Sequence, residues 1–250
     1  MSARAYKDLG VVRAIALYPV KSMQGQLVDA AKLGFAGLAC DREYAFLREQ
    51  DTTGLPWLSA RQCPRLLRYA AAVEDVGERH AAVVIRTPDG EQLDIRDPRL
   101  LAEIIDLAGE PLRLVRVWRR TYDSAGAEVS IITTQSIQAI ADIAERPLEP
   151  ARFRPNVVVE ATAEAPFRED KWVGSSVAIG DGGDPARLRL TRKDPRCRIV
   201  ALDPHTGDED PRIHKIIVGT RKNNLGVYAT VERTGAIAEG QLLRQRVNGG

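Results

Sequence analysis

The sequence predicts a β-rich fold of the α+β class, with many short strands and a few helices. Short runs of residues alternate between apolar and polar, as at the start of 11–22 and in 187–191, which is the pattern of half-buried strands. Apolar residues recur at helical spacing in two segments, within 97–110 and 129–146. At 250 residues the chain can bury a sizeable core as one large domain or two small ones.

Composition excludes several classes of protein. The charged fraction of 28% and the hydrophobic fraction of 44% are typical of a globular protein, and a net charge of +2 with 5% aromatic residues argues against nucleic-acid binding. Cys40, Cys63 and Cys197 form no C-x-x-C pair, which argues against a disulfide framework or a structural zinc site and favours a reducing compartment. The residues MSARAYKDLG lack a secretory signal, and no apolar run of about 18 residues occurs. We therefore expect a cytoplasmic protein with no membrane or nucleic-acid partner.

The first predicted strand, in 11–22, breaks at Pro19 and leaves two polar residues at its end. Proline has no N–H to donate to a strand ladder. Lys21 and Ser22 then stand at the mouth of a loop. A lysine beside a hydroxyl can hold an anion there, and the alternative is an ordinary solvated turn.

A second predicted strand follows Asp41 and Arg42. The two residues can pair with each other, or Arg42 can bind a phosphate or carboxylate with both arms of its guanidinium. The irregular connection in 54–66 offers two further polar candidates, Ser59 and Arg61.

A hairpin and a helix follow. Two apolar runs in 81–95 flank a Pro-Asp-Gly turn, which predicts a β-hairpin. The next segment, 97–110, has Asp97 as its N-cap, Pro98 in the first helical position and Gly109 at its end.

Oxyanion-binding candidates cluster in the second half. Within 129–146 a strand passes into a helix at Thr133, where free N–H groups can hold a phosphate or simply be capped. Further on, Arg152 and Arg154 alternate, so we expect both side chains on one side of an extended segment. With Asn156 they form a donor set suited to an oxyanion or a phosphate.

The predicted strand in 187–191 leads to Cys197, which lies among cations at Arg192, Lys193, Arg196 and Arg198. Pro195 ends the ladder just before it. Neighbouring cations favour the thiolate, which is both a nucleophile and a soft metal ligand. The alternative is a buried cysteine that acts as a small apolar residue. After this segment we expect two more strands in 212–243.

Six short motifs occur in order along the chain: YPVKS (18–22), the pair Asp41-Arg42, RFRPN (152–156), the spaced residues Phe167, Glu169, Asp170 and Trp172, the RC pair followed by DPHTG (196–207), and GVYA (226–229). In this order they make the chain similar to the molybdenum cofactor sulfurase C-terminal (MOSC) domain family. The resemblance is to the branch with an N-terminal MOSC β-barrel domain, which includes the mitochondrial amidoxime-reducing component and its bacterial relatives.

The resemblance implies a fold, a cofactor and a set of contacts. It implies a MOSC-type β-barrel domain, over 113–247, packed on a smaller N-terminal β-barrel-like domain, over 10–112, with a molybdenum cofactor of the molybdopterin type. The metal-binding cysteine of the family falls on Cys197. We expect cofactor contacts from Lys21, Ser22, Arg42, Thr133, Arg152, Arg154, Asn156, Arg196 and Tyr228.

One position departs from the family pattern. Many relatives carry a second cysteine three residues before the metal ligand, where this chain has Asp194. No ferredoxin-like extension follows the MOSC segment, so the resemblance implies a separate electron-donor protein, ferredoxin-like or cytochrome b5-like, with its reductase.

The implied activity is reduction of small N-hydroxylated compounds, hydroxylamines and amidoximes, with Cys197 as metal ligand and catalytic residue. The alternative is a sulfur-carrier or cofactor-transfer protein that uses a persulfide on Cys197.

Overall fold

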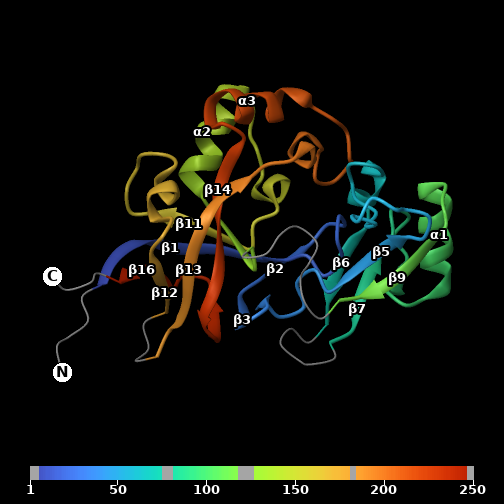
Figure 1. Ribbon diagram of the computed structural model, residues 1–250, viewed down its shortest axis with the longest axis horizontal. Helices are drawn as coiled ribbons and strands as arrows, with labels where there is room; N and C mark the ends of the chain where they lie inside the picture. Colours follow the sequence, from blue (N-terminus) through green and yellow to red (C-terminus); the bar gives the residue numbers. More distant parts are fainter. Residues whose placement is uncertain (1–5, 75–80, 118–126, 181–183, 247–250) are drawn as a thin grey trace.

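A closed β-barrel dominates the structure. The computed structural model of the protein describes residues 6–74, 81–117, 127–180 and 184–246. Seven strands follow one another around the barrel in the order β11-β10-β14-β13-β12-β16-β1, and pairing of β11 with β1 closes it. Figure 1 shows these strands crossing on the left of the molecule. Their bounds are β1 Tyr6–Leu17, β10 Val129–Thr133, β11 Val157–Ala161, β12 Ser176–Ile179, β13 Ala186–Pro195, β14 Asn224–Arg233 and β16 Leu242–Arg246. The predicted β-rich fold is confirmed.

Strand β1 connects the barrel to the rest of the molecule. Its first half pairs with β16, its middle with β11, and its last residues with β2 (Gln26–Val28). At Gly10 a Cβ atom would lie 2.3 Å from the Glu160 carbonyl oxygen, so only glycine lets the two strands approach this closely. Although β1 falls within the range predicted for the N-terminal domain, it is a barrel strand, and the domain limits near residue 112 stay a prediction.

Two short sheets and one helix form the smaller part of the molecule, on the right of Figure 1. One sheet pairs β6 with β7 and β7 with β8, and the other pairs β5 with β9. A third short sheet places β3 between β15 and β4, and it packs on the barrel core through buried Leu33, Leu38 and Ile237. The bounds are β3 Ala30–Gly34, β4 Gly37–Leu38, β5 Tyr44–Arg48, β6 Ala70–Val73, β7 Val83–Arg86, β8 Gln92–Asp94, β9 Leu112–Arg116 and β15 Gly235–Ala238. Hence the hairpin predicted in 81–95 is confirmed.

Helix α1 (Pro98–Ala108) forms where the sequence predicts it. The Asp97 carboxylate accepts a hydrogen bond from the Arg99 N–H, and Gly109 ends the helix in a left-handed conformation. Buried Leu100 and Ile104 pack α1 on the core of the smaller part. A fully buried side chain of this size contributes roughly 1.5–3 kcal/mol.

Helices α2 (Thr134–Ala144) and α3 (Pro211–Arg221) lie together at one end of the barrel (Figure 1). Helix α2 confirms the prediction made from 129–146. The two strands expected in 212–243 are present as β14 and β15, but the sequence analysis did not predict helix α3, which begins at the Asp210 cap. Short 3-10 turns complete the described elements: η1 Pro64–Arg68, η2 Pro150–Phe153, η3 Arg168–Trp172 and η4 Arg198–Ala201.

Candidate functional site

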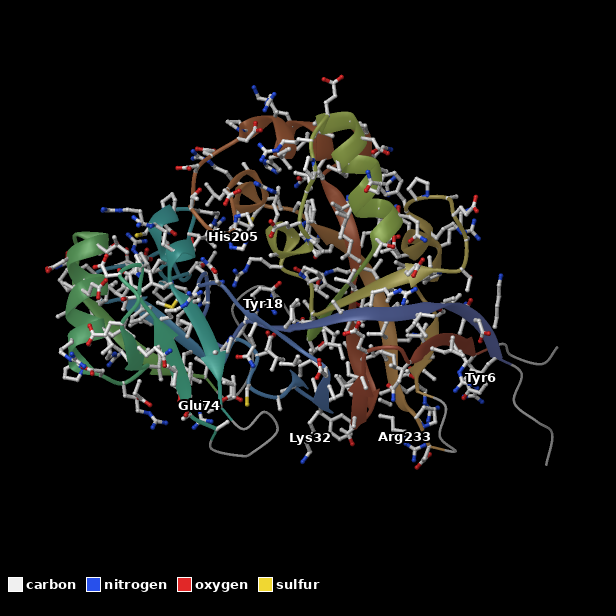
Figure 2. All side chains as sticks on the ribbon, turned by 180° about the vertical axis from the view of Figure 1, so that it is seen from behind. Tyr6, Tyr18, Lys32, Glu74, His205 and Arg233 are labelled. Carbon is white, nitrogen blue, oxygen red and sulfur yellow. The ribbon has the colours of Figure 1, made fainter. Side chains whose placement is uncertain are left out.

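A cavity of about 320 Å³ is lined by residues from both the barrel and the smaller part. The barrel contributes the end of β13 and the turn that follows it, and the smaller part contributes the turn after β1 and the connection before η1. In Figure 2 the labelled Tyr18 lies between the two parts of the molecule, with His205 above it. The seven predicted site residues that line the cavity are Lys21, Ser22, Arg42, Arg154, Arg196, Cys197 and Tyr228.

Cys197 is an accessible thiol at the end of a strand. Strand β13 ends at Pro195, and the Arg196 N–H donates to the Asn223 carbonyl at 2.8 Å, which turns the chain toward the cavity. Cys197 then caps the turn η4, whose Val200 N–H donates to its carbonyl. The thiol is exposed, whereas Cys40 and Cys63 are buried. The reading of Cys197 as a buried apolar residue is therefore wrong.

Lys21 and Ser22 lie where β1 ends. The Lys21 N–H donates to the Tyr44 carbonyl at 2.8 Å, and the Ser22 backbone adopts a left-handed φ of 68°. Asp41 holds the same corner, because its carboxylate accepts the Tyr18 N–H at 2.7 Å. The turn is thus fixed by internal bonds, with the two polar residues facing the cavity.

Two guanidinium groups stack on one buried tyrosine. The Cζ atoms of Arg42 and Arg154 lie 4.8 and 4.3 Å from the centre of the Tyr18 ring, within range of cation–π attraction. Burial raises the pKa of Tyr18, although both arginines oppose the shift, so the phenol stays neutral at physiological pH. Arg42 bonds Asp41 at 2.6 Å, so the local pair forms while Arg42 still lines the cavity.

Backbone carbonyls hold the same two arginines in place. Arg42 Nη2 donates to the Arg154 carbonyl at 2.9 Å, and Arg154 Nη1 donates to the Met23 carbonyl at 2.7 Å. Arg42 and Met23 come from the first half of the chain, and Arg154 comes from the second. These bonds join the two parts beside the cavity and fix the positions of two positive charges.

Asn156 lies behind the cavity wall. Its Oδ1 accepts the Ser130 N–H at 3.1 Å and a bond from Arg42 Nη1 at 3.4 Å, and its Nδ2 donates to the Ala16 carbonyl at 3.3 Å. The side chain is 2% exposed. Asn156 therefore positions Arg42 and the strands on either side.

Arg152 supports the turn that follows Cys197. Arg152 itself belongs to the 3-10 turn η2, and Arg154, which follows that turn, has a left-handed backbone. The expectation that Arg152 and Arg154 lie on one side of an extended chain is therefore wrong. Arg152 is buried, Nη1 donates to the Leu202 carbonyl at 2.7 Å, and Nη2 pairs with Asp203 at 3.2 Å. Burial lowers the pKa of Arg152. Arg152 does not line the cavity.

Thr133 caps α2 in the interior. Its Oγ1 accepts the Ser136 N–H and donates to the Glu169 carboxylate at 2.9 Å, and the residue is fully buried. The sequence left two roles open for Thr133, a phosphate contact or a helix cap. The structure shows the helix cap, and Thr133 does not line the cavity.

Asp194, the position that departs from the expected family pattern, forms a buried ion pair with Arg196. Asp194 binds Arg196 Nη1 and accepts the Ser130 hydroxyl at 3.2 Å, while Arg196 Nη2 donates to the Phe153 carbonyl. Both residues line the cavity wall but are less than a tenth exposed. Arg196 is therefore neutralised, and its side chain ties the RC motif to η2.

Tyr228, a residue of strand β14, also lines the cavity. Its ring packs beneath Arg192, whose Cζ atom lies 5.3 Å from the ring centre. Gly226, two residues earlier, has a φ of 82°, and a Cβ there would lie 2.8 Å from the Ile131 carbonyl oxygen. The glycine of the GVYA motif therefore lets β14 approach β10.

Several lining residues were not assigned to the site from the sequence. Ser59 and Arg61 stood out only as polar residues in a connection, and Leu55, Ser130 and Ile199 not at all. No spacing pattern links the 54–66 connection to Cys197. Only the fold brings them together.

Comparisons with known proteins agree with this architecture. The family model described as "MOSC domain" matches residues 119–244, and the one described as "MOSC N-terminal beta barrel domain" matches residues 9–127. Mitochondrial amidoxime reducing component 2 of Bos taurus is 23% identical over 306 residues, which cover 98% of this chain and 85% of that protein.

Two further relatives are more distant or more partial. The molybdenum cofactor sulfurase of Emericella nidulans is 37% identical over 73 residues, which are 28% of this chain and 8% of that protein. The crystal structure of the YUAD protein from Bacillus subtilis has a TM-score of 0.50 and 13% identity, covering 98% of this chain and 100% of that one, and is evidence for the fold alone.

No helix in the described ranges is long and apolar enough to cross a membrane. The MOSC model alone matches half of the chain, and the barrel, the motif order and the relatives agree with it. This chain belongs to the MOSC domain family.

Proposed function

We propose that this protein is a molybdenum cofactor-dependent reductase of N-hydroxylated compounds, hydroxylamines and amidoximes, with Cys197 as the protein ligand of the metal. The observation that supports the proposal most strongly is that one cavity holds an accessible thiol together with Lys21, Arg42 and Arg154. The similarity of this chain to the amidoxime reducing components also supports reduction of N-hydroxylated compounds.

The donor set fits a molybdopterin-type cofactor. Such a cofactor presents a phosphate, which needs fixed cations and hydroxyls, and Lys21, Ser22, Arg42 and Arg154 line the cavity from both halves of the chain. The metal needs a soft ligand, which the Cys197 thiolate provides. Thr133, Arg152 and Asn156 would support this set from behind rather than touch the cofactor.

The reaction we propose breaks an N–O bond: a hydroxylamine takes up two electrons and two protons and yields an amine and water. When bound, the cofactor supplies the two-electron chemistry. The chain's residues hold the metal at Cys197 Sγ, fix the phosphate and shape the substrate pocket. Because the thiol is exposed, solvent water can deliver the protons. A separate electron-donor protein, ferredoxin-like or cytochrome b5-like with its reductase, and a cytoplasmic location are parts of this proposal.

The experiment is a metal and turnover analysis of protein made in a host that synthesises the cofactor. We expect close to one molybdenum per chain and reduction of benzamidoxime with reduced methyl viologen as electron source. Cys197→Ala should lose both the metal and the activity, because no second thiol lines the cavity among the described residues. Cys63→Ala, which removes a buried thiol from the core of the smaller part, should keep both the metal and the activity. Full metal occupancy without turnover would reject the reductase.

A second candidate function is sulfur carriage or cofactor transfer. The exposed thiol and the similarity to molybdenum cofactor sulfurase favour it. Mass spectrometry separates the two functions, since a persulfide on Cys197 without bound molybdenum would support the carrier.

A further inference from the structure

Arg61 stands at the cavity in a well-fixed turn. The Cys63 and Gln62 N–H groups both donate to the Ser59 carbonyl, at 3.0 and 2.9 Å, and the Ser59 hydroxyl bonds the Gln62 side chain. The turn η1 begins at the next residue, Pro64. The backbone that carries Arg61 is therefore anchored, while its side chain is exposed and lines the cavity.

Arg61 differs from the other cavity arginines because its charge has no partner among the residues that the structure describes. Arg42 is paired with Asp41, Arg196 with Asp194, and Arg154 is bonded to the Met23 carbonyl. Within the ranges that the structure describes, the Arg61 guanidinium makes no ion pair or hydrogen bond. An uncompensated guanidinium beside a cavity favours an anionic ligand, and a carboxylate matches its two-armed geometry.

Apolar surface lies in the same cavity. Leu55 is a large hydrophobic residue that is 61% exposed, and Ile199, two residues after Cys197, also lines the cavity. Asp194 is the carboxylate among the described lining residues, and Arg196 already holds it. The cavity therefore offers an apolar wall and a positive charge, and no available negative charge that would attract a cationic substrate.

We propose that Arg61 is a specificity-determining residue that selects N-hydroxylated substrates carrying a carboxylate on an apolar body. This inference rests on the proposed reductase function. The apolar body packs on Leu55 and Ile199, and the carboxylate pairs with Arg61. The chemical step is unchanged: the N–O bond breaks, the oxygen leaves as water, and the electron donor supplies two electrons.

Three amidoximes of nearly equal shape test the inference: benzamidoxime, 4-carbamoylbenzamidoxime and 4-carboxybenzamidoxime. Only the last carries a negative charge, and the carbamoyl compound matches its size. With holoenzyme and reduced methyl viologen, we expect kcat/KM for the carboxylate to exceed that for the carbamoyl compound by about fivefold, the scale of a pair between partly exposed charges. The ratio should fall toward one at high salt.

Variants of Arg61 test whether this side chain causes the preference. Arg61→Gln should abolish the fivefold ratio between the carboxylate and the carbamoyl compound, while Arg61→Lys should restore part of it. Arg65→Gln, which removes an exposed charge outside the cavity from the same region, should leave the ratio intact. Isothermal titration without an electron donor gives a second readout, in which the carboxylate should bind about fivefold more tightly to wild-type protein than to Arg61→Gln.

The outcomes separate the two proposals. If no amidoxime is reduced by metal-loaded protein, the reductase fails, and the titration alone then decides whether Arg61 binds carboxylates. If all three are reduced with equal kcat/KM and Arg61→Gln changes no ratio, the inference on Arg61 is overturned. A loss of molybdenum in Arg61→Gln would also overturn it, because Arg61 would then hold the cofactor and not the substrate.

Discussion

Three residues of the cavity wall share a backbone conformation that ordinary side chains avoid. Ser22, Arg42 and Arg154 have φ values of 68°, 51° and 51°. Each such residue costs of order 1 kcal/mol, and residues of this kind cluster at binding sites, where the surrounding structure over-determines them. Here the stacking on Tyr18 and the bond from Arg42 to the Arg154 carbonyl supply that constraint.

Arg152 provides a test of a supporting role. Replacing it with alanine leaves the Leu202 carbonyl and Asp203 without their buried partner. We expect Arg152→Ala to lower the free energy of unfolding by about 2–3 kcal/mol in urea denaturation. Arg198→Ala, which removes a solvent-exposed pair with Glu209, should change the stability far less. Unchanged stability with lost metal would instead mean that Arg152 contacts the cofactor.

The sequence motifs pointed to residues that lie in one region of the structure, but they could not separate residues that line the cavity from residues that support its wall. Cys197, Lys21 and Arg154 line the cavity, whereas Asn156 and Thr133 lie behind it. A motif marks every residue that a site needs, whether it faces the ligand or holds a residue that does. Burial and hydrogen-bond partners, which depend on the fold, make the distinction.

Among the elements, α3 shows why a local pattern can mislead. Its Ile-Ile-Val run resembles a strand, yet Asp210 and Pro211 begin it just as Asp97 and Pro98 begin α1. Buried Ile213 and Ile217 then pack it into the core shared with α2. In both α1 and α3 an Asp-Pro pair therefore marks the start of the helix.

The cap of α3 predicts a specific acid sensitivity. The Arg212 side chain lowers the pKa of Asp210 to about 2, from an ordinary value of 3.8, and the Arg212 N–H adds to the shift. Because the folded pKa is below the unfolded one, the stabilising contribution is complete above pH 4 and is lost as the pH falls toward 2. We expect Asp210→Ala to lower the unfolding free energy by about 1 kcal/mol at pH 7. Urea denaturation from pH 7 to pH 2 should show this difference shrinking, and a constant difference would contradict the assignment.

At the scale of the whole molecule, the cavity depends on how the halves interleave. Strand β1 belongs to the barrel although it begins the chain, and β3, also from the first half of the chain, pairs with β15 and packs on the barrel core. The sequence predicted two closely packed halves but not this exchange, because pairing between distant strands leaves no local pattern. The exchange is what brings Lys21 and Cys197 to one cavity.

The interleaving predicts that the proposed cofactor, when bound, stabilises the entire protein. A ligand held by Lys21 and Arg42 from one half, and by Arg154 and Cys197 from the other, binds only when both are folded and docked. Ligand at 100 times its Kd adds about 2.7 kcal/mol, which for a chain of this size raises Tm by roughly 5 to 10 °C. Calorimetry of protein from cofactor-competent and cofactor-deficient hosts measures the shift. Lys21→Gln should reduce it, whereas Lys7→Gln, outside the cavity, should not. Equal Tm values for protein with and without the cofactor would mean that residues from the two halves do not bind it together.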